Sequence, residues 1–177
     1  MARLFIAVWP PEEVAEQLRE LHRKEQRGVR FVDPDNWHLT VRFLGEADPR
    51  EVVAALDGAT FPATHVSLGP AVDVHFDRAL VVPASGLEDL AHVVNECTKG
   101  IGEPPRKRFV GHLTIARVQR DVPMPRVLGA YVRAEFLVRE IVLVQSWLEP
   151  QGARYATLET WPVDGWQHDR GAGAAGQ

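Results

Sequence analysis

HLTVRFL, at residues 38–44, is the stretch around which the chain is organised, because the sequence repeats it as HLTIARV at residues 112–118. The second copy begins 74 positions after the first. In both copies His and Thr alternate with apolar, often β-branched residues, which is the pattern of a half-buried β-strand. Two ordinary strands that each carry a surface histidine would explain the tripeptides alone, but the flanking residues repeat as well.

Each of the two predicted strands places an imidazole beside a hydroxyl. Successive side chains of a strand point to opposite faces, so His38 and Thr40 share one face and Arg42 follows them on it. His112 and Thr114 share a face of the second strand in the same way. The opposite face of each strand is left to apolar side chains.

The flanks of the two strands repeat in the same order. Residues 3–44 read as strand, proline, helix begun by acids, turn and His-x-Thr strand, and residues 78–118 read as the same series. This pattern predicts a duplicated unit of roughly 40 to 45 residues. Two copies related by a pseudo-two-fold axis would bring equivalent strands face to face across a cleft, where one imidazole from each half would meet.

Short strands and helices are predicted along the whole chain. In the N-terminal half we expect a strand, a helix that Gly28 ends, a short strand, a turn and a helix capped by Asp48, at residues 3–9, 10–28, 29–32, 33–36 and after 48. The C-terminal half is expected to hold two extended segments, a helix opened by Ser85, and a hairpin of two long strands, at residues 64–76, 78–83, 85–100, 136–148 and 154–161. Residues 165–177 lack a core-forming pattern and are predicted to be a disordered tail in which His168 is solvated.

The composition limits the classes of protein to which the chain can belong. It has 177 residues, 45% hydrophobic and 25% charged, with a net charge of −4, which fits one compact domain or two small fused lobes. That charge excludes a basic nucleic-acid coat protein, so any polyanion must meet a local basic patch. The single Cys97 excludes an internal disulfide framework and a cysteine-based zinc site. Without a membrane span or export signal in the sequence, we expect a cytoplasmic protein.

Two histidines that converge on one site form a general acid and general base pair. Imidazole titrates near pH ~6.5, so one ring can be neutral while the other is protonated. Threonine hydroxyls and backbone N–H groups can donate to phosphate oxygens, and a nearby arginine supplies charge. The pattern favours phosphodiester cleavage in which one histidine activates water and the other protonates the departing oxygen. A metal centre is disfavoured, because neither strand adds a third ligand and no carboxylate shares the histidine faces.

The chain resembles the two-histidine (2H) phosphoesterases, in particular the RNA 2',3'-cyclic phosphodiesterase branch, also called LigT-like or 2'-5' RNA ligase proteins. Four segments carry the resemblance, in the family's order and across residues 3 to 162: RLFIAVWPPEEV, NWHLTVRFLG, FVGHLTIAR and LVQSWLEPQGARYATLETWP. One position departs from the family pattern. Gly111 stands where the family usually has proline before the second histidine, and we expect it to loosen the local backbone without removing a catalytic atom.

The resemblance implies a bilobal α+β fold, with two antiparallel sheets flanking a central groove and helices outside. It implies one domain over residues 1–164, whose two halves carry the motifs at 38–44 and 112–118. It also implies hydrolysis of 2',3'-cyclic phosphate ends of RNA to 2'-phosphomonoesters without metal or cofactor. Reversal of this chemistry would join such an end to a 5'-hydroxyl.

The family motifs correspond to particular residues of this chain. By similarity, His38 and Thr40 form the first motif and His112 and Thr114 the second. We favour His112 as the base and His38 as the acid, although the sequence leaves these roles open. The implied partners are RNA ends or nucleotides with a 2',3'-cyclic phosphate. We expect a monomer that binds neither a membrane nor another protein.

Several further residues are candidates for the site. Arg42, on the histidine face, and Arg117, at the family's arginine position, are candidate phosphate ligands. Strict alternation points Arg117 away from His112, which a bulge or a salt bridge between sheets would resolve. Two further groups either contact substrate or have a structural role: the basic run Arg106, Lys107 and Arg108, and the aromatic residues Trp37, Phe109 and Tyr155. Four histidines have no repeat partner and are expected to be surface or structural residues: His22, His65, His75 and His92.

Two other functions compete with the RNA enzyme. One is a nucleotide or RNA-binding module that uses the same groove without turnover, although such a module has no need of two imidazoles. The other is a phosphodiesterase for the cyclic phosphate of a small nucleotide, such as an ADP-ribose derivative. Hydrolysis of an oligonucleotide and of a mononucleotide substrate would separate these possibilities.

Overall fold

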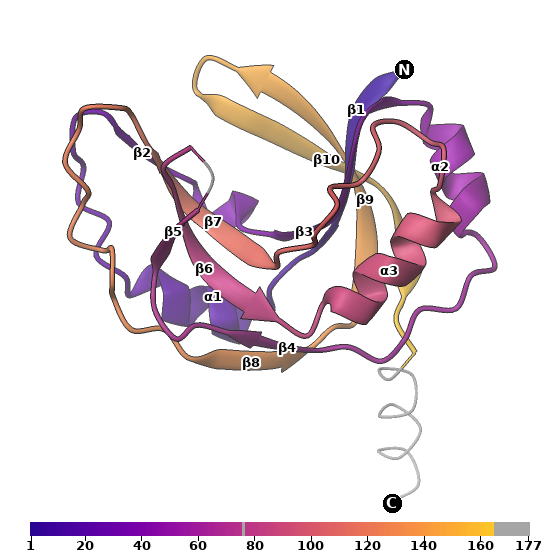
Figure 1. The fold of residues 1–177 in the computed structure, drawn as a ribbon, viewed down its shortest axis with the longest axis horizontal. Helices are drawn as coiled ribbons and strands as arrows, with labels where there is room; N and C mark the ends of the chain where they lie inside the picture. The colour runs from indigo at the N-terminus through magenta and orange to yellow at the C-terminus, as the bar shows by residue number, and fades with distance from the viewer. Residues whose placement is uncertain (76, 165–177) are drawn as a thin grey trace, which may run out of the picture.

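The structure, a computed structural model, describes residues 1–75 and 77–164, so the predictions for Phe76 and for residues 165–177 fall outside the described residues. Figure 1 shows a body of strands with the α-helices on its outside. The elements follow the chain as β1 (Ala2–Val8), α1 (Glu12–Arg19), β2 (Val29–Phe31), the 3-10 helix η1 (Pro34–Asn36), β3 (Leu39–Ala47), α2 (Pro49–Leu56), β4 (His65–Leu68), β5 (Asp73–His75), β6 (Ala79–Ser85), α3 (Glu88–Cys97), β7 (His112–Val118), β8 (Ala134–Leu137), β9 (Glu140–Glu149) and β10 (Gly152–Pro162).

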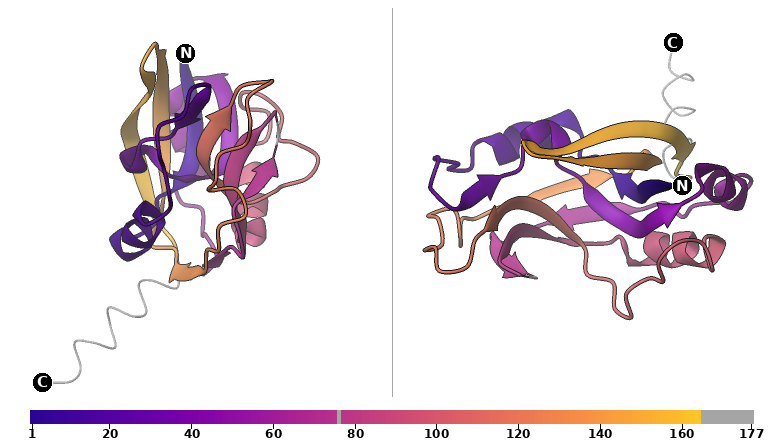
Figure 2. Two further views of the ribbon diagram at one scale, coloured as in Figure 1. Left: turned by 90° about the vertical axis from the view of Figure 1, so that its left-hand side faces the viewer. Right: turned by 90° about the horizontal axis from the view of Figure 1, so that it is seen from above.

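The strands pair in the order β10-β9-β1-β3-β7-β6-β4-β8, with β2 added to β7 and β5 added to β6. These pairings are antiparallel. Figure 2 shows the β9–β10 hairpin in one layer and β6 with β8 in another. The predicted α+β class, with antiparallel sheets and outer helices, is confirmed.

The two halves of the chain pair their strands in the same register. β1 pairs with β3 in the first half, and β6 pairs with β7 in the second. Adding 74 to the residue numbers of a β1–β3 partner pair gives a partner pair of β6 and β7. For example, the pair Ala7–Thr40 corresponds to the pair Val81–Thr114. In the same way, Val8–Leu39 corresponds to Val82–Leu113. The backbone therefore repeats in the way that the two His-x-Thr stretches repeat in the sequence.

Each His-x-Thr strand contains one extra residue directly after its threonine. Ala7 faces Thr40 whereas Ile6 faces Arg42, so Val41 has no partner on β1. In β7 the same shift leaves Ile115 without a partner on β6. Such a bulge reverses the inside–outside alternation of the residues that follow it. Residues after the bulge therefore point to the faces opposite to those that strict alternation predicts.

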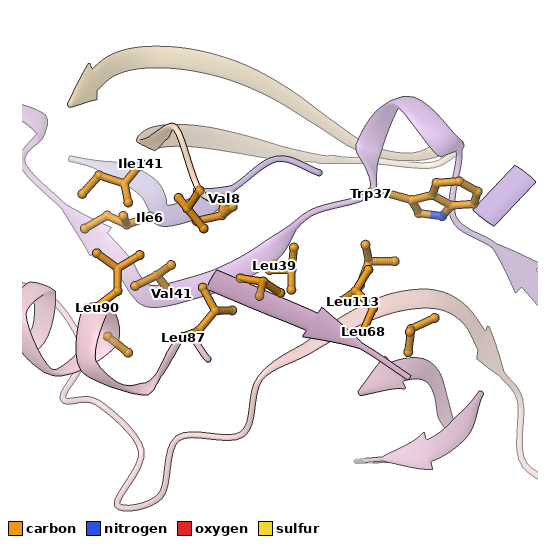
Figure 3. Packing of buried hydrophobic residues seen from close by; sticks show 14 of the residues in the cluster. Ile6, Val8, Trp37, Leu39, Val41, Leu68, Leu87, Leu90, Leu113 and Ile141 are labelled. Carbon is orange, nitrogen blue, oxygen red and sulfur yellow. The ribbon is translucent and has the colours of Figure 1, made fainter. Parts of the chain in front are cut away.

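β3 and β7 meet at one pair, Leu39 opposite Leu113, which are themselves 74 positions apart. The pseudo-two-fold axis of the repeat therefore passes through this pair. The equivalent strands lie edge to edge here, rather than face to face across a cleft as the sequence suggested. Figure 3 shows both leucines among the buried side chains of the core. Because neighbouring side chains alternate, the flanking histidines and threonines lie on the opposite face.

The core holds the two halves together, because helices cross from one half to the other. α3, from the second half, packs against β3 of the first, and α1, from the first half, packs against β8 of the second. Leu87 and Leu90 at the start of α3 are fully buried, and Figure 3 shows them beside Val41 and Leu39. Burial of such side chains fixes the position of β3 relative to β7, and with it the position of the two motifs.

The first helix is shorter than the sequence predicted. α1 ends at Arg19, whereas the glycine stop at Gly28 predicted a helix longer by two turns. Leu18 is the last fully buried residue, and the N–H groups of Glu20 and Leu21 already bond three residues back. The polar residues that follow offer no apolar face to the core, so the helix is not continued.

The predicted long strand at residues 136–148 is also wrong, because it is two strands that lie near opposite ends of the strand order. β8 pairs with β4, whereas β9 pairs with β1 and β10. The exposed neighbours Arg139 and Glu140 separate them, and two successive exposed residues break the alternation of a strand. The return strand of the predicted hairpin is present as β10.

Candidate active site

His38 and His112 lie on either side of the Leu39–Leu113 pair. In an antiparallel register through that pair, Thr40 stands across from His112, and His38 across from Thr114. The four polar side chains therefore surround the pseudo-two-fold axis on one face. Electrostatic repulsion between the rings, in which His112 lowers the pKa of His38, agrees with this proximity. The structure thus brings together the four motif residues that the sequence singled out.

The two imidazoles are held by equivalent hydrogen bonds. Nδ1 of His38 lies 2.8 Å from the carbonyl oxygen of Asn36, and Nδ1 of His112 lies 2.8 Å from that of Val110. A carbonyl only accepts, so each Nδ1 carries the proton that it donates. Nε2 is therefore the nitrogen that titrates in both rings. Nε2 of His38 lies 3.1 Å from the hydroxyl of Thr40, which donates to the neutral ring.

Aromatic side chains enclose His38. The ring of Phe5 lies 4.8 Å from the imidazole, that of Tyr155 lies 5.4 Å away, edge to face, and that of Trp9 lies 5.6 Å away. Burial among these rings is the main cause that lowers the pKa of His38, whereas the bond to the Asn36 carbonyl acts to raise it. Both the burial and the direction of this shift favour the neutral form of His38 near pH 7.

Cationic side chains gather around His112. The pKa of His112 is lowered first by burial and then by electrostatic interaction with His75, Arg106 and Arg117, while the bond to the Val110 carbonyl acts to raise it. The ring of His75, on β5, lies 6.2 Å from that of His112. The site is thus unequal on its two sides, aromatic at His38 and cationic at His112.

Arg117 lies on the histidine face, because the bulge at Ile115 reverses the alternation of β7. It faces Ala79 across the strand pair, whereas Ala116 faces Leu80 and is buried. The positive charge of Arg117 also acts on Tyr155, whose pKa burial raises and Arg117 lowers. Of the two explanations that the sequence left open for Arg117, a bulge or a salt bridge between sheets, the structure contains the bulge.

Arg42 lies away from the site, so its prediction as a phosphate ligand is wrong. The bulge at Val41 turns it to the face of Ile6, where only 3% of the residue is exposed. Its Nη2 donates to the carbonyl oxygens of Ile101 and Glu103, at 3.2 and 2.7 Å. Arg42 therefore holds the loop between α3 and β7 against β3, and has a structural role.

The structure adds residues that the sequence did not assign to the site. His75 has no repeat partner and was interpreted as structural, yet it stands beside His112. Phe43 is the repeat equivalent of Arg117, and the bulge places it on the same face, with the guanidinium of Arg3 4.8 Å from its ring centre. Applying the 74-residue shift to Arg117 would have identified Phe43. Nothing in the sequence pairs His75 with the site.

Some of the other aromatic and basic candidates lie near the two histidines, and others belong to the core. Trp37 is 1% exposed and belongs to the core, and Phe109 packs against that core. Tyr155 instead contacts His38. The basic run 106–108 is exposed, and Arg106 acts on His112 through its charge.

Gly111 does not loosen the backbone, as its place in the motif suggested, but allows a close approach of two strands. A Cβ at this position would lie 2.5 Å from the carbonyl oxygen of Ala84. The N–H of Ala84 in turn donates to the Gly111 carbonyl at 3.0 Å. This backbone contact positions the residue directly before His112.

Neither a metal-binding cluster nor a membrane-spanning helix is present in the described part of the chain. In residues 1–75 and 77–164, no three His, Cys, Asp or Glu side chains gather that could hold a metal ion. The described helices, of ten residues or fewer, are too short to cross a bilayer.

The lowered histidine pKa values predict the acid limb of the pH–rate profile. The base must be neutral, so the fall of kcat/KM on the acid side should begin only below pH 6.5, the ordinary pKa of histidine. Replacement of His75 by glutamine removes a group that lowers the pKa of His112 and should move this limb upward. The same lowered pKa values affect stability. As the pH falls below about 6.5, the histidines of the unfolded chain bind protons while those of the folded chain do not. The free energy of unfolding therefore decreases with falling pH until the pKa of the folded histidines is passed. Rate profiles of both proteins test this, and a wild-type limb above pH 6.5 would contradict it.

A pair of His-x-Thr strands around a pseudo-two-fold axis, on this α+β fold, defines the class of two-histidine phosphoesterases. The sequence model of the LigT-like phosphoesterase family matches residues 8–72. An RNA 2',3'-cyclic phosphodiesterase of Thermus thermophilus is 32% identical over 191 residues, covering 95% of this chain and 93% of the relative. One of Archaeoglobus fulgidus is 30% identical over 174 residues, covering 90% and 99%. This chain belongs to the LigT-like phosphoesterase family.

Solved structures agree with this assignment. A crystal structure of a Thermus thermophilus protein superposes with a TM-score of 0.76 at 28% identity, covering 91% of this chain and 97% of that one. The crystal structure of Escherichia coli LigT complexed with 3'-AMP superposes with a TM-score of 0.71 at 27% identity, covering 92% and 98%. The likeness extends over both halves of the chain.

Proposed function

We propose that this enzyme hydrolyses 2',3'-cyclic phosphate ends of RNA to 2'-phosphomonoesters, with His38 and His112 as a general acid and base pair. The observation that carries the proposal is the pairing of the two His-x-Thr motifs around Leu39 and Leu113. Relatives of 30% and 32% identity that are named RNA 2',3'-cyclic phosphodiesterase support the substrate class. We also propose that the enzyme acts as a monomer in the cytoplasm.

In this mechanism the cyclic phosphate lies over the pseudo-two-fold axis. The base takes a proton from water through Nε2, and the water oxygen bonds to phosphorus. The bond from phosphorus to the 3'-oxygen breaks, and that oxygen takes the proton from Nε2 of the acid, which leaves a 2'-phosphate and a 3'-hydroxyl. Thr40 and Thr114 donate to the non-bridging oxygens, where negative charge increases in the transition state. When a 5'-hydroxyl attacks phosphorus in place of water, the same steps form a 2'-5' phosphodiester and release the 3'-hydroxyl, which joins two RNA ends.

The surroundings of the two rings suggest which histidine has which role. The cations around His112 oppose its protonation and favour the neutral ring that a base requires. The aromatic faces around His38 can stabilise an imidazolium once the anionic substrate binds. We therefore assign His112 as the base and His38 as the acid.

Chelation should leave the activity unchanged. The two motifs supply proton transfer and hydrogen bonds without a set of metal ligands, so EDTA is expected to leave kcat/KM within twofold of its value in buffer alone. The experiment incubates an oligonucleotide with a 2',3'-cyclic phosphate end, and separately a mononucleoside 2',3'-cyclic phosphate, with and without EDTA. Products are identified against 2'- and 3'-phosphate standards. Activity lost in EDTA and restored by a divalent ion would contradict the metal-free mechanism, and a 3'-phosphate product would contradict the assigned leaving group.

A further inference from the structure

Two arginines stand directly opposite each other on the face that carries the histidines. Arg30 of β2 is the antiparallel partner of Arg117 of β7. Side chains of opposed residues project from the same face of a sheet, and the bulge at Ile115 places Arg117 on the face of His112. Both arginines are exposed. The pair thus extends the site away from the pseudo-two-fold axis, along β7.

The two arginines repel each other unless an anion lies between them. Like charges directly opposite on a sheet are destabilising. Within residues 1–75 and 77–164, neither guanidinium forms a salt bridge or a hydrogen bond that would offset this repulsion. A bound phosphate would replace one repulsion with two charge-assisted contacts.

The turn between β9 and β10 closes the end of this surface. A Cβ at Gly152, in that turn, would lie 3.1 Å from Nη2 of Arg30, so the guanidinium rests against the turn. Asn36 ties the same hairpin to the segment before His38, because its Nδ2 donates to the carbonyl oxygen of Ala153 at 3.0 Å. Arg30 is therefore held at the end of a path that begins at the histidines.

The spacing along this path fits the next phosphate of an RNA strand. Thr114 and Arg117 are neighbours on one face, two pleat steps apart, which is about 7 Å of strand. Successive phosphates of an RNA strand are separated by a distance of this order. Resting on the function proposed above, we propose that Arg30 and Arg117 bind the phosphodiester one nucleotide before the cyclic phosphate, so that the enzyme prefers oligonucleotide ends to mononucleotides.

The charge of the neighbouring segments supports a polyanion at this end of the molecule. Residues 20–30 and 117–127 together contain seven Arg and Lys against three Asp and Glu, whereas the whole chain carries a net charge of −4. A hydrogen bond from Gln26 Nε2 to the Pro123 carbonyl oxygen, at 2.9 Å, links the two segments. Both lie at the end of the molecule where Figure 1 labels β2, opposite α2.

Three substrates isolate the second phosphate. They are a dinucleotide with a 2',3'-cyclic phosphate end, the same dinucleotide with an uncharged methylphosphonate linkage, and the mononucleoside 2',3'-cyclic phosphate. The wild-type enzyme should prefer the natural dinucleotide to the other two by about fivefold to tenfold in kcat/KM, the range for charged contacts at an exposed site. Its log kcat/KM should also fall with log salt more steeply than that of the mononucleotide, by a slope of about 0.7.

The variant Arg30→Ala should lose this preference and the additional salt slope, and should hydrolyse the mononucleotide at a rate within twofold of wild type. Arg50→Ala, an exposed arginine on α2 at the other end, is the matched control and should keep the preference. Equal rates on the natural and methylphosphonate dinucleotides, or an unchanged preference in Arg30→Ala, would overturn the proposal. Binding of the mono- and dinucleotide 2'-phosphates by calorimetry tests the arginine pair even if no substrate is turned over, a result that would overturn the proposed function instead.

Discussion

Replacement of His38 or His112 by alanine is expected to lower kcat/KM by about 10²–10⁴-fold, the usual contribution of one positioned proton transfer. Equivalent bonds of Nδ1 to a carbonyl oxygen hold both imidazoles, and in the proposed mechanism both rings act on the same phosphate. Residues that act as a unit are non-additive, so the double variant should lose far less than the product of the two single losses. His92→Ala, an exposed histidine on α3, is the control and should keep full activity.

Replacement of either threonine by alanine should lower kcat/KM less than replacement of a histidine. Thr40→Ala and Thr114→Ala each remove one hydrogen bond to the phosphate and should cost about tenfold. The measurement is kcat/KM of all the variants on one cyclic-phosphate substrate, with circular dichroism to confirm folding. If either histidine variant kept near-wild-type activity, the paired-histidine mechanism would be wrong.

Gly111→Ala is expected to have the second largest effect, on both stability and rate. The new Cβ would lie 2.5 Å from the Ala84 carbonyl oxygen, so β6 and β7 must move apart directly before His112. Overpacking of this kind costs about 1–3 kcal/mol, and in a chain of this length each kcal/mol lowers Tm by about 2–4 °C. Displacement of His112 should reduce kcat at the same time.

Gly58→Ala is the matched control for this variant. Gly58 has nothing within 4 Å of an added Cβ, but its positive φ of 79° makes the substitution mildly destabilising. It should therefore lower Tm without lowering kcat. Thermal unfolding and kcat of both variants separate a local effect on the site from a general loss of stability. Wild-type kcat in Gly111→Ala would show that this contact does not position His112.

The sequence predicted the motif residues and their duplication because both are local patterns. A strand with His and Thr on one face is visible in seven residues, and the repeat at 74 positions is visible without a structure. The acidic cap of α2 was predicted for the same reason, and Asp48 does accept from the N–H of Arg50.

The errors arise where the partner of a residue lies far away in the chain. Alternation placed Arg42 in the site and Arg117 outside it, and the bulges at Val41 and Ile115 reverse both assignments. A bulge depends on the register with the neighbouring strand, which the sequence of one strand does not contain. Similarly, His75 reaches His112 only because β5 folds back on β6.

The prediction of one long strand at residues 136–148 was wrong for a related reason. Each part of it has the composition of a strand, but β8 pairs with β4 and β9 pairs with β1, near opposite ends of the strand order. The choice of partner is a tertiary property, so only the exposed pair Arg139 and Glu140 marked the break. Arg42 shows how such an error affects the prediction of function. It was expected in the site, but it donates to the carbonyl oxygen of Glu103 and holds a loop instead.

The central claim, that His112 is the base and His38 the acid of one site, is tested most directly by pH–rate profiles of the two single variants. The residual kcat/KM of His112→Ala and His38→Ala is measured across the pH range on one cyclic-phosphate dinucleotide. We expect His112→Ala to lose the acid limb, because no base remains to be protonated, and His38→Ala to lose the alkaline limb. Loss of the same limb in both variants, or a bell-shaped profile that persists in either, would contradict it.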